Sequence, residues 1–403
     1  MSFWTKSEAA KEFHVSPTTI NNWIIATEKN KVNLDIATVG TKTVLVESEH
    51  NRKIIKQLIE KGKKHIGRGG RVEVEVSDRF YKIFSQSQAI EIITNLENDK
   101  LIPLKYTYFD KGASMWDDYI IADLNNPDYS YNKKEEILIN STLSYLDLKI
   151  QKYDKVNIID IGPGNGYIAK PIINKLIDLK KDIKYTGMDI SSSMLDILKK
   201  NLGQWYPNLN TEYVLTDIDY DIIRDHLFFN KHNEEKSSCN IILFLGSTIG
   251  NFYDRHRVYK NFYDSMSQDD FLWINSGIET PGEVSAIKKH AKKDAIVEES
   301  SWIPELLGIE EDLYALEVNY NEKIESYVLC LRLNVDLDIV FTLQTKEKRI
   351  SLNKGDDIIV WNYHSYKLEQ FVDELNNVGF RIINQASYPD NSEAIIMSEK
   401  GNN

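Results

Sequence analysis

The chain is poor in cysteine and in long apolar runs. Its two cysteines, Cys239 and Cys330, are too few for a disulfide framework or a cysteine-based metal site. The eight histidines form no HxxxH or HExxH pattern, so we expect no metal centre. No apolar run approaches the roughly 18 residues of a membrane span, and the opening MSFWTKSEAAKEF lacks a signal-peptide core. We therefore expect a cytoplasmic, metal-free protein with no membrane contact.

Length and charge both indicate more than one part. A chain of 403 residues predicts two or three domains, and a hydrophobic content of 42% allows substantial cores. Residues 1–71 hold 13 Lys and Arg against 7 Asp and Glu, whereas the other residues hold 36 against 54. Charge of opposite sign in two segments favours different roles for them.

A glycine-rich segment follows the first clear strand pattern. The apolar run 156–159 leads directly into DIGPGNGYIA at 160–169. Gly162, Gly164 and Gly166 allow a tight turn and a close approach of the backbone to a ligand beside a helix N-terminus. Similar turns also join ordinary strands to helices, so the motif alone does not establish a ligand site.

Acidic residues follow the next two strand patterns. Asp189 comes after the run 185–188, and Asp217 comes after 213–215. An acid after the second strand can accept hydrogen bonds from two ribose hydroxyls, and one after the third suits the exocyclic amine of adenine. Together with Asp160, they predict an α/β, Rossmann-like fold that binds S-adenosylmethionine (SAM). NAD is the competing cofactor, but GPGNG differs from the spaced GxGxxG form.

The first 64 residues predict a helix-turn-helix-like module. Ser7 can cap a first helix, a turn follows at 15–17, and Thr18 or Thr19 can start a second. The run 39–46 predicts a wing. One interpretation is DNA contact through residues such as Thr18, Thr19, Asn21, Asn22 and Lys31. The other is a protein-interaction or dimerisation module, and the sequence leaves both open. Residues 65–71, basic and glycine-rich, predict a flexible linker.

Three further segments follow the linker. Residues 72–150 are mostly helical by pattern, and we assign them to the substrate side of the site as a lid. Residues 151–280 alternate strand and helix, which is typical of a doubly wound sheet. Residues 281–403 predict a second, α+β domain for substrate recognition. Its expected elements are helices at 283–295, 304–313 and 365–378 and strands at 326–334, 337–346 and 357–361.

Three motifs resemble a known family. LFLGSTIGNF at 243–252, the loop YFDKGASMWDD and the later PDYSYNKKE resemble the histidine-specific, SAM-dependent N-methyltransferases of the ergothioneine pathway, a group that includes fungal amino-acid N-methyltransferases. The resemblance runs from about Leu101 to the C-terminus and leaves out the N-terminal module. It implies a class I methyltransferase core acting on a nitrogen of an amino acid or amino-acid-like molecule.

The resemblance also implies roles for individual residues. The cofactor would be held by Gly162, Gly164, Asp189, Asp217, Ile218 and Gly246. Asn251 would hold the carboxylate or amine of the substrate, Tyr108 would face the reacting amine, and Tyr129 would line the substrate side chain. The alternatives are that the two tyrosines are core aromatics and that Asn251 is a turn former.

One departure from the family bears on the substrate. Its members recognise imidazole through an acid and a serine near a late strand end. In VWNYHSYK (360–367) the serine is kept as Ser365, but Tyr363 stands where the acid is expected. Losing that hydrogen bond costs about 1–3 kcal/mol if its partner stays unpaired, so we do not expect histidine as the substrate. Trp361 and Tyr363 favour an apolar or aromatic substrate part, or a pocket filled by the protein itself.

The leading hypothesis is therefore methyl transfer to a nitrogen of an amino acid or amino-acid-like substrate. Two others stay open. One is a DNA-binding regulator whose SAM domain senses a ligand. The other is a methyltransferase acting on a peptide or protein brought by residues 1–64, with a homodimer as a further option.

Overall fold

Two compact units make up the chain. The computed structural model describes residues 3–15, 17–28, 32–39, 42–63, 71–127, 130–227, 237–280, 302–343 and 346–401. Unit 1 comprises Met1–Glu75 and Val335–Asn353, and unit 2 comprises Val76–Asn334 and Lys354–Asn403. Each unit is thus assembled from segments far apart in the sequence. Within the described residues, no helix combines the length and apolarity needed to cross a membrane.

Unit 1 begins with two helices. Helix α1 (Lys6–Phe13) starts with a capping box, in which the Thr5 hydroxyl accepts from the Glu8 N–H and the Glu8 carboxylate accepts from the Thr5 N–H at 2.8 Å. The predicted cap at Ser7 was wrong, because the reciprocal pair with Glu8 places the cap at Thr5. The helix ends at His14 in a left-handed conformation, and α2 (Pro17–Glu28) begins with a proline at its first position.

A small sheet and a third helix complete this module. Strands β1 (Phe3–Trp4), β3 (Lys42–Val46) and β2 (Ile36–Val39) pair antiparallel in that order, and α3 (Glu49–Lys63) follows. Apolar side chains from both helices, the sheet and α3 share one core, which includes Trp4, Phe13, Ile20, Ile24, Leu45 and Ile55. Of the predicted DNA contacts, Asn22 is exposed, Asn21 accepts a hydrogen bond from Lys6, and Lys31 lies outside the described residues.

A second sheet of unit 1 joins two segments that lie far apart in the sequence. Strand β4 (Val72–Glu75) pairs in parallel with β12 (Leu337–Leu343), which pairs antiparallel with β13 (Lys346–Leu352). The Arg71 guanidinium donates to Asp338 at 2.8 Å and to the Leu337 carbonyl at 3.1 Å. Arg71 is therefore part of this sheet rather than of a flexible linker, whereas 65–70 lie outside the described residues.

Unit 2 is built around a seven-stranded sheet. Its order is β15-β16-β9-β8-β5-β6-β7. The five strands from β9 to β7 in this order are parallel, and β16 is antiparallel to both of its neighbours. This is the order expected of a class I methyltransferase core. The bounds are β5 Lys155–Ile161, β6 Asp182–Asp189, β7 Asn210–Leu215, β8 Ser238–Phe244, β9 Phe271–Gly277, β15 Phe380–Ser387 and β16 Glu393–Lys400.

The predicted domain boundary after residue 280 is not supported, because the sheet continues across it. Strands β15 and β16, which we had assigned to a separate α+β domain, complete the Rossmann-like core. Between them and β9 along the chain lie the strands of another sheet, so the core is interrupted in sequence but continuous in space. The expected helix at 283–295 lies outside the described residues.

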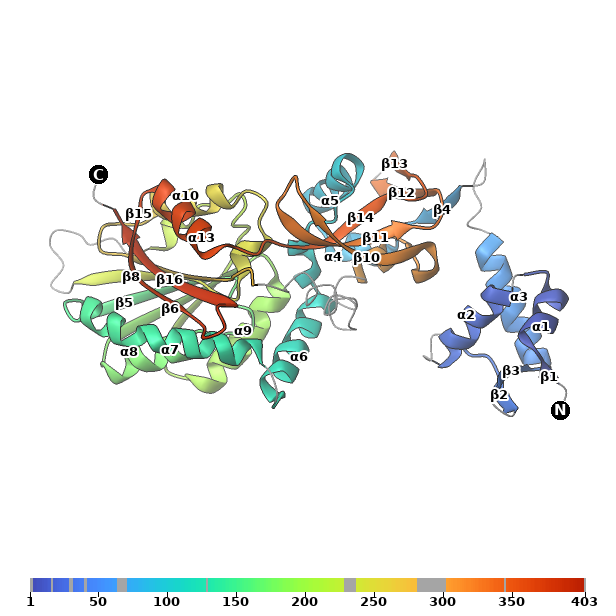
Figure 1. The fold of residues 1–403 in the computed structure, drawn as a ribbon, viewed down its shortest axis with the longest axis horizontal. Helices are drawn as coiled ribbons and strands as arrows, with labels where there is room; N and C mark the ends of the chain where they lie inside the picture. Colours follow the sequence, from blue (N-terminus) through green and yellow to red (C-terminus); the bar gives the residue numbers. More distant parts are fainter. Residues whose placement is uncertain are drawn as a thin grey trace. The chain divides into compact units, whose positions relative to one another are not determined.

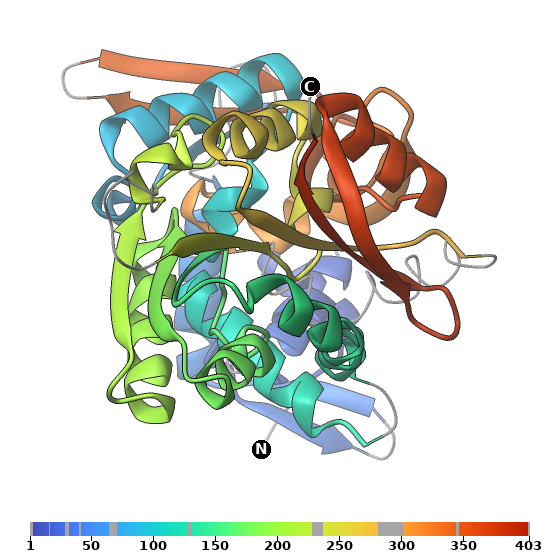
Figure 2. The same ribbon diagram turned by 90° about the vertical axis from the view of Figure 1, so that its left-hand side faces the viewer.

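Helices cover both faces of the seven-stranded sheet. Figure 1 shows α7 (Tyr131–Ile150) and α8 (Lys170–Asp178) along one face and α10 (Arg255–Ser265) and α13 (Leu368–Val378) over the other, and Figure 2 turns the same layers by 90°. Helix α9 (Ser192–Trp205) packs on the face of α7 and α8. Each face has its own apolar core, as a doubly wound sheet requires.

A smaller sheet in unit 2 carries the residues next to the predicted substrate. Strands β10 (Tyr314–Asn321), β11 (Ser326–Leu333) and β14 (Asp357–Tyr363) pair antiparallel. The helices before it are α4 (Asp78–Ile83), α5 (Gln86–Asp99), the 3₁₀ turn η1 (Leu104–Tyr108) and α6 (Lys111–Asn125). Hydrogen bonds at 2.8–2.9 Å join Ile359 of β14 to Lys100 and Ile102. The lid segment that contains Tyr108 is thus tied to the strand that contains Trp361 and Tyr363.

One buried carboxylate supports the junction of β8 and β9, and it can be tested. Asp270 is 1% exposed and accepts from the Asn240 N–H at 2.9 Å, the Asn240 amide at 2.8 Å and the Ser267 N–H at 2.7 Å. Asp270→Ala leaves these donors unpaired, so we expect a loss of about 2–4 kcal/mol in the free energy of unfolding by urea. The neighbouring Asp269→Ala, at a half-exposed carboxylate, should cost about 1 kcal/mol or less. Equal losses would contradict this role.

Candidate functional site

A cavity of about 920 Å³ lies in unit 2 at the carboxyl ends of the parallel strands, where open α/β sheets bind their ligands. Its lining comes from the glycine turn, the lid segment, the turn after β8 and strand β14. It brings together eleven predicted site residues: Tyr108, Asp160, Gly162, Gly164, Asp189, Asp217, Ile218, Gly246, Asn251, Trp361 and Tyr363.

Two predicted site residues are not part of this lining. Ser365 is absent from it, because β14 ends at Tyr363 and the strand alternation that points Trp361 and Tyr363 to the cavity stops there. The next residue, Tyr366, is fully buried and pairs with the end of β9. Tyr129 lies outside the described residues.

The glycines form a cradle for a ligand. Gly162, Gly164 and Gly246 have φ angles of 62°, 55° and 73°, in the left-handed region that favours glycine. A Cβ on Gly164 would come within 3.2 Å of the Trp116 ring nitrogen. Both the positive φ angles and the limited space thus favour glycine in this turn.

Two acids lie at the carboxyl ends of β5 and β6; Asp160 is buried, and Asp189 is half-buried. Asp189 accepts from the Ser191 N–H at 2.8 Å, and burial raises its pKa to about 7. Asp160 accepts from the Tyr185 hydroxyl at 2.6 Å, and burial, with a smaller contribution from the charge of Asp189, raises its pKa to about 7. Hydrogen-bond donors from a ligand would offset this desolvation, and the ribose hydroxyls of SAM are such donors at Asp189.

The adenine side contains a cation that sequence reasoning missed. Lys105, on η1, donates to Asp217 at 2.7 Å and pairs with Glu91 at 2.8 Å and Asp219 at 3.4 Å. Burial raises the pKa of Asp217, and Lys105 opposes that shift. The lysine therefore fixes the carboxylate expected to meet adenine. No sequence motif predicts this role of Lys105, because its partners are distant in sequence. The one local indication was its position three residues before Tyr108.

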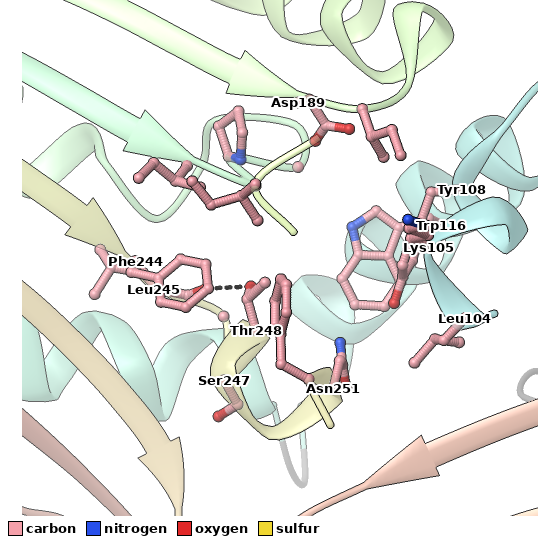
Figure 3. Close-up of a pocket in the computed structure, with 18 of the residues that line it drawn as sticks. Leu104, Lys105, Tyr108, Trp116, Asp189, Phe244, Leu245, Ser247, Thr248 and Asn251 are labelled. Atoms are coloured by element: carbon pink, nitrogen blue, oxygen red, sulfur yellow. Dashed lines mark hydrogen bonds between the residues drawn. The ribbon is translucent and has the colours of Figure 1, made fainter. Parts of the chain in front are cut away.

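The turn after β8 forms the opposite wall. Ser247 has a φ of 55°, and the Thr248 hydroxyl donates to the Leu245 carbonyl at 2.6 Å. Asn251 ends the 3₁₀ turn η3 (Thr248–Asn251), and its carbonyl accepts from the Asn362 amide at 3.1 Å. Figure 3 shows this turn across the cavity from Asp189, with Lys105, Tyr108 and Trp116 on a third side.

Tyr363 fills the place where the family's acid was expected. Its hydroxyl accepts from the Gly277 N–H at 3.0 Å, and a Cβ on Gly277 would lie 2.1 Å from that oxygen. A Cβ on Gly250 would lie 3.0 Å from its ring. Trp361 stacks on it with centroids 6.0 Å apart and planes 15° apart. Two glycines and a stacked indole therefore hold an aromatic ring at this end of the cavity.

Comparison with known proteins identifies the core. Residues 87–286 match the model of the family described as "Histidine-specific methyltransferase, SAM-dependent". The match includes the glycine turn and the turn after β8, and it leaves out the N-terminal module. A malonyl-acyl-carrier-protein O-methyltransferase of Bacillus cytotoxicus is 23% identical over 188 residues, covering 43% of this chain and 64% of that protein. One from Acetivibrio thermocellus is 25% identical over 118 residues, covering 28% and 38%.

The chain thus spans less than two thirds of the length of these two relatives. Among solved structures, a SAM-dependent methyltransferase from Clostridium acetobutylicum is 13% identical, with a TM-score of 0.38, covering 72% of this chain and 98% of that one. The CcbJ methyltransferase from Streptomyces caelestis is 12% identical, with a TM-score of 0.40, covering 73% and 98%.

The buried charge of Asp160 predicts a pH-dependent effect on stability. Its carboxyl titrates near 3.8 when exposed but near 7 in the fold. The stabilisation that its proton provides is therefore complete below about pH 4 and is lost as the pH rises to about 7. Asp160→Asn removes the charge, so it should stabilise the ligand-free protein by about 1–3 kcal/mol at pH 8 and by less at pH 5, measured by thermal unfolding. The exposed Asp196→Asn is the control. A gain independent of pH would contradict the assignment.

Proposed function

We propose that this SAM-dependent methyltransferase, whose residues 87–286 belong to the histidine-specific methyltransferase family, methylates an amine nitrogen of an amino-acid-like substrate other than histidine. The observation that carries the proposal is Tyr363, which lines the cavity at the position where the resemblance predicts an acid. An aromatic ring held by two glycines offers no carboxylate to an imidazole N–H.

The cofactor end is assigned by the chemistry of its groups. SAM supplies a methyl group on a sulfonium centre, which is electrophilic without further activation. Backbone groups at Gly162 and Gly164 would hold the methionine end. Asp189 would accept from the ribose hydroxyls, and Asp217, oriented by Lys105, would accept from the adenine amine.

The acceptor end faces Asn251, Tyr108 and Trp116. The ring of Tyr108 packs edge-on against Trp116, with centroids 5.7 Å apart. Asn251 offers an amide that can bind an amine or a carboxylate. The acceptor nitrogen, held between these groups, would form the new N–C bond as the C–S bond breaks and its electron pair stays on sulfur. The main contribution of the protein is alignment of nitrogen, methyl and sulfur.

The direct test is methyl transfer from labelled SAM to a panel of amino acids and small peptides. We expect transfer to at least one α-amine and little or none to histidine. Tyr363→Glu, which restores a carboxylate at this place, should raise the transfer to histidine relative to the unchanged protein. SAM binding without transfer to any amine would overturn the amine assignment, and efficient transfer to histidine would overturn the substrate exclusion.

Asp189→Asn tests the ribose assignment. Removing the carboxylate should weaken binding of S-adenosylhomocysteine (SAH) about 10- to 100-fold by calorimetry, because charge-assisted hydrogen bonds are each worth about 1.5–3 kcal/mol. Asp196→Asn, an exposed change on α9, should leave the Kd unchanged. Equal affinities of the two variants would remove Asp189 from the cofactor site.

The partner of the N-terminal module stays a prediction. Helices α1 and α2 followed by the β2–β3 hairpin favour binding to DNA, which should weaken steeply with rising salt. Because Arg71 and β4 belong to the sheet with β12, a truncation should end at residue 63 or before. We expect such a truncated protein to lose DNA binding, measured by fluorescence anisotropy, and to keep its SAH affinity. Unchanged DNA binding would contradict this role.

A further inference from the structure

Two buried glutamates lie beside the cavity, and the proposed function does not use them. Glu135 of α7 is 0% exposed, and Glu393, the first residue of β16, is 1% exposed. We call them the carboxylate pair. One oxygen of Glu135 accepts from the Gly246 N–H at 2.6 Å, and one oxygen of Glu393 accepts from the Asn275 amide at 2.8 Å. The second oxygen of each is buried and has no hydrogen-bond partner among the described residues.

Hydrogen bonds connect the carboxylate pair to the acceptor side of the site. The Ser247 N–H, next to Gly246, donates to the Asn275 side chain at 3.3 Å, so both glutamates hold the turn that leads to Asn251. The Tyr131 hydroxyl is hydrogen-bonded to that of Ser247. Glu135 and Tyr131 both line the cavity. The carboxylate pair is therefore connected to the wall that an acceptor amine would face, and Glu135 is itself part of that wall.

Among the residues that the structure describes, the surroundings of the pair contain little positive charge. The ionisable groups that face it are Asp160 of β5, Tyr131 and Lys134 of α7, and, acting on Tyr131, Tyr363 of β14. Lys134 is the cation among them, and its ammonium group bonds to the Asp390 carboxylate at 2.8 Å. Burial and the charge of Asp160 raise the pKa of Glu135 to about 7. Burial and the charge of Glu135 raise the pKa of Glu393 well above its usual range.

We infer that the carboxylate pair binds the acceptor as an ammonium ion and takes the proton that the acceptor nitrogen must lose before methylation. This inference rests on the proposed function. A buried carboxylate without a cation is unfavourable, and a ligand cation removes that penalty. The inference narrows the substrate class to amines that are protonated near neutral pH, and it excludes amide and hydroxyl acceptors.

The proton transfer balances with the methyl transfer. An N–H bond of the ammonium breaks, and its proton goes to an unpartnered carboxylate oxygen of the pair. The freed lone pair then forms the N–CH₃ bond, and the C–S electrons remain on sulfur. The positive charge moves from sulfur to the methylated nitrogen, and the proton leaves the carboxyl group for solvent when the products depart. Tyr131, bonded to Ser247 at the cavity wall, is a positioning residue.

An analogue of the cofactor can test the effect of this negative charge, even though the methyl acceptor is not identified. Sinefungin matches SAH except that a carbon bearing an amino group replaces the sulfur, so it carries an ammonium group where the methyl group leaves. With the carboxylate pair in place, calorimetry at pH 8 should give a Kd for sinefungin at least about tenfold below that for SAH. In the unchanged protein this ratio should fall toward one at pH 5.5, which lies below the pKa of about 7 of the Glu135 carboxyl.

Substitutions of the two glutamates test whether they cause the difference in affinity between sinefungin and SAH. Glu135→Gln and Glu393→Gln should each reduce the ratio of the two Kd values several-fold while the Kd for SAH changes by less than about threefold. The matched control is Glu399→Gln on the same strand, whose carboxylate pairs with Lys149 and Arg381 away from the cavity. It should leave the ratio unchanged. The pH series on the unchanged protein keeps the test valid if a variant does not fold.

The outcomes separate this inference from the proposed function. If SAH does not bind the unchanged protein, the cofactor site itself fails. If SAH binds but sinefungin has no advantage, or its advantage persists at pH 5.5 or in both variants, the carboxylate pair does not face the reacting nitrogen. If both ligands weaken equally in Glu135→Gln, the pair serves the amino-acid end of the cofactor instead, and the inference is overturned.

Discussion

Negative charge buried without a matching cation at the carboxyl ends of the parallel strands is the constraint on which the site depends. Asp160 and Asp189 end or follow β5 and β6, and Glu135 and Glu393 approach the same edge from α7 and β16. Backbone N–H groups and neutral side chains provide most of their partners. Such groups hold the acids in place without neutralising them, so the ligand-free site is electrostatically incomplete. Under the proposed function, a cationic cofactor and a protonated amine would complete it.

The two ends of the cavity differ in how the charge of their acidic side chains is compensated. At the adenine end, Lys105 is built into the lid and supplies a fixed positive charge to Asp217 and its neighbours. At the acceptor end, the lid contributes the aromatic rings of Tyr108 and Trp116 instead. Lys105 and Tyr108 share one short 3₁₀ turn, so the same segment contributes side chains to both ends of the cavity.

Sequence reasoning was most successful where the signal is local. The glycine turn and the acids after β5, β6 and β7 could be placed because strand, turn and acid are adjacent in the chain. Lys105, Glu135 and Glu393 could not, since each acquires its role only from partners far away in sequence. Ser365 was predicted from the resemblance of 360–367 to the family, and it lies beyond the end of β14 and outside the cavity lining. The assignment of β15 and β16 to another domain failed for the same reason as the linker at Arg71: pairing between distant strands leaves no local pattern.

The parallel pairing of β4 with β12 also sets an order of events during synthesis. Residues 72–75 leave the ribosome long before residues 337–340, which supply their hydrogen-bonding partners. At roughly 5–20 residues per second, β4 waits on the order of tens of seconds with an unpaired edge. Its sequence VEVE alternates valine with glutamate, and charge on an exposed edge disfavours pairing with other chains. The glutamates of this short strand thus protect the nascent chain in the interval before its sheet can close.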